Sequence, residues 1–217
     1  MSKSVKIEFV SDVSCTWCAI GIKSLEAAIA AVAPEIEVDV HFQPFELNPD
    51  MPVGGQNLTE HIDEKYGSSP ASWATSRENI RQRGEAVGFR FSLNEDSRIY
   101  NTFNAHRLLH WARLEGKQVE LKRALMAAHL SEGQDPGDQD VLIRAAVMAG
   151  LNTDTARSIL DSDAYIEEVR SLEERWIREG VRAVPTLVLN GGQKVEGSLP
   201  AKNYEQLIRE AAASITV

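Results

Sequence analysis

The fold is decided by residues 5–18, which read VKIEFVSDVSCTWC. The β-branched run at residues 5–10 predicts a strand, and the apolar-periodic stretch that begins at Ala19 predicts a helix directly after it. Cys15 and Cys18, the only cysteines of the chain, therefore lie where a strand passes into a helix. The unpaired N–H groups at the start of a helix carry partial positive charge, which stabilises a thiolate more than a thiol. We therefore expect a redox-active pair in which Cys15 ionises more easily than a free thiol.

Two other uses of a cysteine pair fit this sequence less well. A structural zinc site needs about four ligands, and none of the five histidines lies near the pair in the sequence. A structural disulfide between Cys15 and Cys18 would close too short a loop to constrain the unfolded chain much. We therefore predict a catalytic pair and no bound metal.

Composition excludes several classes of protein. A chain of 217 residues with 43% hydrophobic content can bury one sizeable core. No apolar run approaches membrane-spanning length, and residues 1–6 have none of the features of a secretory signal, so we expect a cytoplasmic protein with no membrane partner. In a reducing cytosol a cysteine pair is more often catalytic than structural. The net charge of −9 disfavours nucleic acid as a partner.

Strand patterns at the two ends of the chain flank a long helical middle. The N-terminal part predicts a strand, a helix and a second strand, an order that favours a parallel βαβ unit. The C-terminal part predicts a β-hairpin around an Asn-Gly-Gly turn, followed by a closing helix. These elements are expected at residues 5–10, 16–32, 35–42, 185–190, 193–197 and 200–213.

The middle of the chain predicts helices almost throughout. A loop rich in Pro and Gly at residues 44–56 precedes them, and no internal repeat is present. The expected helices cover approximately residues 70–88, 97–114, 117–130, 138–148, 153–160 and 163–179. We therefore divide the chain into one α/β domain, residues 1–46 plus 165–217, and an inserted helical domain, residues 47–164.

This order of elements, with the dithiol at the start of the first helix and Val184-Pro185-Thr186 before the third strand, resembles the thioredoxin fold. The resemblance implies an α/β protein: a thioredoxin fold with a large all-helical insertion domain. It also implies a cis peptide bond before Pro185, in a loop that lies against the dithiol. Such a loop would let Val184 pair with an extended substrate peptide.

The chain as a whole resembles the DsbA-type oxidoreductases with a helical insertion, and within them the FrnE-like branch. Four motifs carry the resemblance: SDVSCTWC at residues 11–18, PFELNPDMP at 44–52, NTFNAHRL at 101–108 and VPT at 184–186. It covers nearly all 217 residues. It implies a thiol–disulfide oxidoreductase that uses the dithiol Cys15-Thr16-Trp17-Cys18 on protein or small-molecule thiols and disulfides. No resident cofactor is expected, with glutathione as a candidate redox partner, and the protein is expected to be a monomer or a homodimer.

The resemblance also assigns roles to individual residues. Cys15 exchanges with the substrate sulfur and Cys18 resolves the mixed disulfide. A cleft-facing role for His106 has a core-facing histidine as its alternative, and Asn48 could equally be a turn residue. The residues expected to contact substrate are Trp17, Asn48, His106, Val184 and Pro185.

Two positions depart from the family pattern. The family commonly has proline after the first cysteine, where this chain has Thr16, so the redox potential of relatives does not carry over. Thioredoxin has a buried carboxylate six residues before the first cysteine, where this chain has Phe9. Glu8 lies one residue earlier, and we expect it to be solvated or paired across strands.

A second class of enzyme shares this scaffold. The 2-hydroxychromene-2-carboxylate isomerases and kappa-class glutathione transferases use the thiol of a bound glutathione and typically carry serine at the position of Cys15. They need no second cysteine and bind glutathione through a Gly-Ser-Asp-like turn, which here is Gly197-Ser198-Leu199 without the acid. The intact cysteine pair therefore favours dithiol chemistry, with a glutathione-dependent isomerase or transferase as the alternative.

Overall fold

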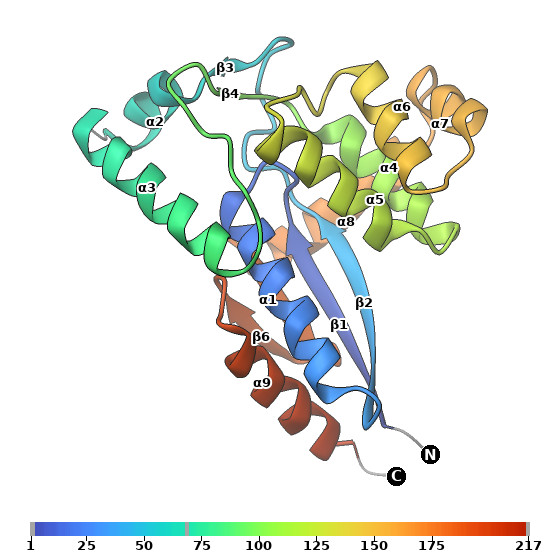
Figure 1. Ribbon diagram of the computed structural model, residues 1–217. Helices are drawn as coiled ribbons and strands as arrows, with labels where there is room; N and C mark the ends of the chain where they lie inside the picture. Colours follow the sequence, from blue (N-terminus) through green and yellow to red (C-terminus); the bar gives the residue numbers. More distant parts are fainter. Residues whose placement is uncertain (1–2, 68–69, 216–217) are drawn as a thin grey trace.

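The computed structural model describes residues 3–67 and 70–215, and in it a mixed sheet carries helices on both faces (Figure 1). The sheet has four strands in the order β2-β1-β5-β6, in which β1 and β2 are parallel and the other neighbours antiparallel. This is the predicted βαβ unit joined to the predicted hairpin. The elements are β1 (Lys3–Ser11), α1 (Thr16–Val32), β2 (Ile36–Pro44), β5 (Thr186–Leu189), β6 (Gln193–Glu196) and α9 (Ala201–Ala213).

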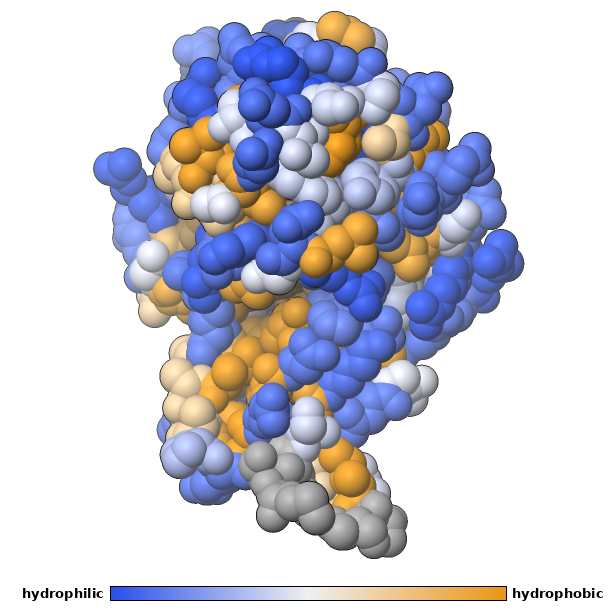
Figure 2. Space-filling view, turned by 90° about the vertical axis from the view of Figure 1, so that its right-hand side faces the viewer, coloured by the Kyte–Doolittle hydropathy of each residue, from blue (hydrophilic) through white to orange (hydrophobic). Residues whose placement is uncertain are grey.

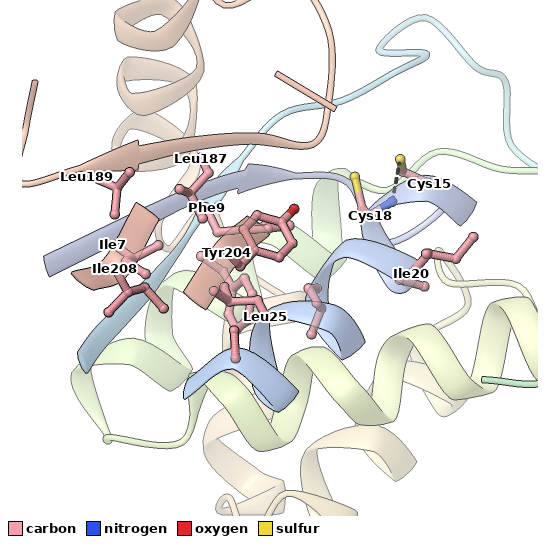
Figure 3. Packing of buried hydrophobic residues seen from close by; sticks show 14 of the residues in the cluster. Ile7, Phe9, Cys15, Cys18, Ile20, Leu25, Leu187, Leu189, Tyr204 and Ile208 are labelled. Carbon is pink, nitrogen blue, oxygen red and sulfur yellow. Dashed lines mark hydrogen bonds between the residues drawn. The ribbon is translucent and has the colours of Figure 1, made fainter. Parts of the chain in front are cut away.

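The two faces of the sheet follow from the alternation of side chains along β1. Phe9 and Ile7 point toward α1 and α9, where they pack with Tyr204 and Leu25 in the main core (Figure 3). Val10 points the other way and packs with Trp176 of helix α8 (Ile166–Arg178). The central strand is thus covered on both sides, although Lys6 and Glu8 interrupt its apolar residues.

The insertion forms two groups of helices above the sheet, α2 and α3 on one side and α4 to α7 on the other (Figure 1). A short antiparallel ribbon of β3 and β4 joins them at the top. None of the helices in the described ranges has both the length and the hydropathy needed to cross a bilayer. The elements are β3 (Gln56–Asn57), α2 (Leu58–Tyr66), α3 (Pro70–Ala86), β4 (Arg98–Ile99), α4 (Phe103–Leu114), α5 (Gln118–Met126), the π-helical turn η1 (Ala127–Ser131), α6 (Gln139–Met148) and α7 (Thr153–Leu160).

Two of the predicted helices are wrong at their ends. The helix expected at residues 97–114 begins only at Phe103, because β4 pairs with β3 instead and the Asn101 side chain accepts the Phe103 N–H at 2.9 Å. The helix expected at residues 117–130 is α-helical only to Met126 and continues as the π-helical η1. Tertiary pairing and a local side-chain acceptor outweigh helix propensity at these points.

The insertion shares its packing with the sheet. Ile80, Phe91 and Met126 of the insertion belong to the same core cluster as Phe9. In the other direction, Val13 of the β1–α1 loop is buried in the cluster formed by α4 to α7. The division at residues 46/47 and 164/165 stays a prediction, but each part contributes residues to an apolar cluster of the other.

Gln118 of α5 ties the edge strand β2 to the insertion. Its side-chain amide accepts the Phe42 N–H at 2.9 Å and donates to the Phe42 carbonyl oxygen at 2.9 Å. It also donates to the Leu109 carbonyl oxygen of α4 at 3.2 Å. Because these groups are buried, the amide supplies hydrogen bonds that water cannot.

An apolar groove of about 600 Å³ lies beside β2 and the C-terminal half of α1. Figure 2 views the molecule from this side and shows hydrophobic side chains gathered in its lower half. The groove is separate from the cysteine pair, which lies at the other end of α1. Its apolar lining residues are Ile22, Leu25, Ile29, Val38, Val40 and Val119.

We expect Gln118→Met to lower the free energy of unfolding by about 1–3 kcal/mol, because it leaves the buried N–H and C=O of Phe42 without partners. Urea unfolding followed by circular dichroism measures the change. Gln206→Met, at an exposed position of α9, is the control and should stay within about 0.5 kcal/mol of the wild type. Equal stability of the two variants would contradict the bridging role of Gln118.

Candidate active site

The cysteine pair lies at the N-terminus of α1, as the sequence predicts. Cys15 is the N-cap residue, with extended backbone angles of φ −83° and ψ 110°. Its sulfur accepts the backbone N–H of Cys18 at 3.1 Å, the contact drawn in Figure 3. The same sulfur lies 3.7 Å from the carbonyl oxygen of Val184. The Cys15 sulfur is thus held between the N-terminus of α1 and the loop before β5.

The two sulfurs differ in environment, although both cysteines are free in the structure. Cys15 keeps 5% of its surface exposed and lines a cleft, whereas Cys18 is fully buried. Burial raises the pKa of the Cys18 thiol well above its ordinary value, and the neighbouring Cys15 sulfur raises it further. An incoming substrate therefore meets Cys15 first.

The cleft beside Cys15 has a volume of about 720 Å³, within the range typical of small-molecule and peptide sites. Residues from both the sheet and the insertion line it. Burial lowers the pKa of His61 and of His129 in its wall, which keeps both rings uncharged at neutral pH. The cationic groups of the lining are Lys65, Arg98 and Arg182, and its apolar residues include Trp17, Leu58, Ile62, Trp73, Leu93 and Val184.

Three of the residues predicted to contact substrate lie on this cleft: Trp17, Asn48 and Val184. Trp17 is 38% exposed, and the guanidinium of Arg83 lies 5.3 Å from the centre of its ring. Asn48 lies on the cleft wall and also stands in a turn, while its contact with substrate stays a prediction. Its side chain accepts from Lys65 at 2.8 Å on the cleft wall, and its carbonyl oxygen accepts the Met51 N–H of a turn.

Pro185 and His106 occupy other positions. The Val184–Pro185 peptide bond is cis, and the Pro185 ring packs against α1, 3.4 Å from where a Cβ at Gly21 would stand. His106 is buried in the core, where its Nε2 lies 3.4 Å from Asp12 Oδ1. The core-facing alternative therefore describes His106, and the expectation that it lines the substrate cleft is wrong.

Glu8 is buried on the far face of the sheet. Glu8 is the neighbour of Phe9 on β1, and successive side chains of a strand point to opposite faces of the sheet. Glu8 therefore points away from α1 and the dithiol. Its carboxylate accepts from Gln43 on β2 at 3.4 Å and lies 4.0 Å from the guanidinium of Arg175. Of the two alternatives expected for Glu8, the structure therefore shows cross-strand pairing, and α8 covers this face.

A buried carboxylate that the sequence analysis did not single out lies behind the dithiol. Asp12 accepts the backbone N–H of Leu47 at 2.8 Å and that of Ser14 at 3.4 Å. Burial by itself would raise the pKa of Asp12, but His106, the Leu47 N–H and Lys122 together hold it well below its usual range. Asp12 therefore remains an anion and fixes the loop that leads into α1.

Lys122 of α5 is the second buried charged group that the sequence did not reveal. Its side chain is almost completely buried, and its ammonium group lies 5.8 Å from the centre of the Phe42 ring. Burial lowers the pKa of Lys122, while Cys18, Asp12 and Cys15 act in the opposite direction. A lysine on an amphipathic helix is usually a surface residue, so the sequence held no signal for this placement. Asp12 could have been found, since it lies within the SDVSCTWC motif.

The site shows no arrangement for a metal. Within residues 3–67 and 70–215, no group of three or more His, Cys, Asp or Glu side chains is placed to hold an ion. The chemistry that these residues can perform themselves is nucleophilic attack by one sulfur, followed by attack of a second sulfur on the first.

Sequence and structure comparisons identify the class. The family model of the DSBA-like thioredoxin domain matches residues 6–209, so the chain belongs to this family and the predicted resemblance is confirmed. The uncharacterised protein YwbO of Bacillus subtilis is 26% identical over 95% of this chain and 97% of its own length.

Solved structures agree on the fold. The probable DsbA oxidoreductase of Streptomyces coelicolor superposes with a TM-score of 0.90 at 29% identity, over 98% of this chain and 92% of its own. The cytosolic disulfide reductase DsbM of Pseudomonas aeruginosa, solved with GSH, has a TM-score of 0.58 at 16% identity, over 96% of each chain. The predicted thioredoxin fold with a helical insertion is thus confirmed.

We expect Asp12→Asn to destabilise the protein by about 1–3 kcal/mol at pH 7, because the buried carboxylate loses its charged contacts. The pKa of Asp12 is depressed in the folded state, so its contribution is complete above about pH 4 and fades as the pH falls below that. The difference between the variant and the wild type should therefore shrink as the pH falls from about 4 to 2. Urea unfolding at several pH values measures it.

Asp50→Asn, at an exposed position, serves as the control for this titration. It should match the wild type at every pH. A constant difference between Asp12→Asn and the wild type down to pH 2 would show that the charge of Asp12 does not stabilise the fold.

Proposed function

We propose that the protein is a thiol–disulfide oxidoreductase in which Cys15 exchanges with the substrate and Cys18 resolves the intermediate. The supporting observation is the arrangement of the pair: Cys15 on the cleft wall at the helix N-terminus, and Cys18 buried behind it with its N–H on the Cys15 sulfur. Family membership supports the same class of reaction.

In the reducing direction, the Cys15 thiolate attacks one sulfur of a substrate disulfide. A bond forms between Cys15 and that sulfur, the substrate S–S bond breaks, and the other substrate sulfur leaves as a thiolate that takes up a proton. The Cys18 thiol then loses its proton and attacks Cys15. The enzyme becomes a disulfide and the substrate leaves as a second thiol, so two electrons have passed to the substrate. Oxidation of a dithiol substrate is the reverse sequence.

The cleft suits an extended substrate with apolar groups beside its sulfur. Val184 lies next to the Cys15 sulfur, and its backbone can pair with a peptide laid along this wall. Glutathione is our candidate for the redox partner in a cytoplasmic setting. Its carboxylates match Lys65, Arg98 and Arg182 in the lining, and the similar fold of DsbM, which was solved with GSH, supports the choice.

Cys15→Ser should abolish disulfide reduction, because it removes the accessible nucleophile. Cys18→Ser should accumulate a mixed disulfide on Cys15, because the resolving sulfur is absent. Turnover of a fluorescent peptide disulfide with glutathione as reductant measures the activity, and intact-protein mass spectrometry detects the adduct.

The matched pair of single variants also tests the assignment of roles. Adducts trapped on Cys18 in the Cys15→Ser protein would reverse it. Full activity of the Cys18→Ser protein in the peptide-disulfide assay would contradict the dithiol mechanism. It would favour the glutathione-dependent isomerase or transferase class, which needs no second cysteine.

A further inference from the structure

Lys122 is a buried charged group whose ammonium makes no hydrogen bond. Its Nζ is buried and has no hydrogen-bond partner among the described residues. A buried ammonium without hydrogen bonds costs free energy. A lysine retained at such a position therefore points to a role in the chemistry nearby.

The surroundings of Lys122 place its charge beside the dithiol. Helix α5 carries Lys122 into the buried interior, within range of electrostatic interaction with Asp12, Cys15 and Cys18. The Asp12 carboxylate interacts with other groups besides Lys122. It faces His106 of α4 and interacts with the more distant His129 of η1. Apart from these groups, Phe42 of β2 provides an aromatic face.

The charge of Lys122 bears on the ionisation of Cys18. It must become a thiolate to resolve the mixed disulfide, yet burial opposes its ionisation. Among the described residues, the positive group that lowers the pKa of Cys18 is Lys122.

We propose that Lys122, supplied by the inserted helices, is the positioning residue that stabilises the Cys18 thiolate in the resolving step. This role rests on the proposed oxidoreductase function. The Cys18 thiol gives its proton to solvent, and the thiolate forms beside the Lys122 ammonium. It attacks the Cys15 sulfur, the bond between Cys15 and the substrate sulfur breaks, and the substrate thiolate leaves and takes up a proton.

A two-step reaction with an aromatic disulfide, 5,5′-dithiobis(2-nitrobenzoate), separates the two sulfurs. Attack by Cys15 of the reduced protein releases one coloured thiolate and leaves the other in a mixed disulfide. Attack by Cys18 then releases the second. With one equivalent of reagent, stopped-flow absorbance records both phases, and mass spectrometry after acid quenching counts the mixed disulfide.

In Lys122→Met the first phase should stay within about twofold of the wild-type rate. The second phase should be about tenfold slower at pH 7, with its midpoint shifted by about one unit to higher pH, because the Cys18 thiolate has lost its charge partner. This variant should also lose some stability, because the buried Asp12 carboxylate loses a nearby positive charge. A purely structural lysine would give the same loss of stability with an unchanged pH midpoint, so the midpoint of the second phase decides between the two roles.

Leu125→Met is the matched control, since Leu125 is a fully buried residue one turn along α5. It should react as the wild type does in both phases. If Lys122→Met does not fold, Lys122→Gln replaces it, with the same expectation. A second phase in the Lys122 variant with the rate and pH midpoint of Leu125→Met overturns the inference while the oxidoreductase function stands. A wild-type protein without a second phase overturns both.

Discussion

The site depends on where α1 begins. The backbone N–H of Cys18 reaches the Cys15 sulfur only because Cys15 is the N-cap and its backbone is still extended. That starting point is set by the loop after β1, whose conformation Asp12 holds through the N–H groups of Ser14 and Leu47. An anion buried in this loop is tolerated because His106 and Lys122 face it. The position of the Cys15 sulfur therefore depends on the Asp12 carboxylate, which does not line the cleft.

The insertion completes the catalytic unit of the sheet. It supplies most of the cleft wall opposite Cys15, and it also supplies His106 and Lys122 below the dithiol. Gln118 binds it to the edge strand through the backbone of Phe42. A movement of the helices relative to the sheet would therefore change both the shape of the substrate site and the charge beside Cys18.

Periodicity predicted the elements that the sheet requires. The β-branched run of β1, the alternation along β2 and the Asn-Gly-Gly turn each have a local cause, so the βαβ unit and the hairpin could be derived from the sequence. The start of α4 could not, because residues 98–99 pair with residues 56–57, which lie far away in the chain. The same limit hid Lys122: its burial follows from the docking of α5 against α1 and β2, and nothing in QVELKRALM marks the fifth residue as interior.

Under the proposed function, the unequal surroundings of the two sulfurs set the order of the two steps. Cys15 meets the cleft, the helix N-terminus and Val184, whereas Cys18 meets the core, Asp12 and Lys122. If both sulfurs were exposed, the substrate could form a mixed disulfide with either of them. In one of these two mixed disulfides, the remaining cysteine would be badly placed to attack and resolve it. Burial prevents that by keeping Cys18 protonated and out of reach until Cys15 has reacted. The same burial makes the Cys18 thiol difficult to ionise. A buried cation supplied by the insertion favours the ionisation of Cys18 without exposing it to solvent.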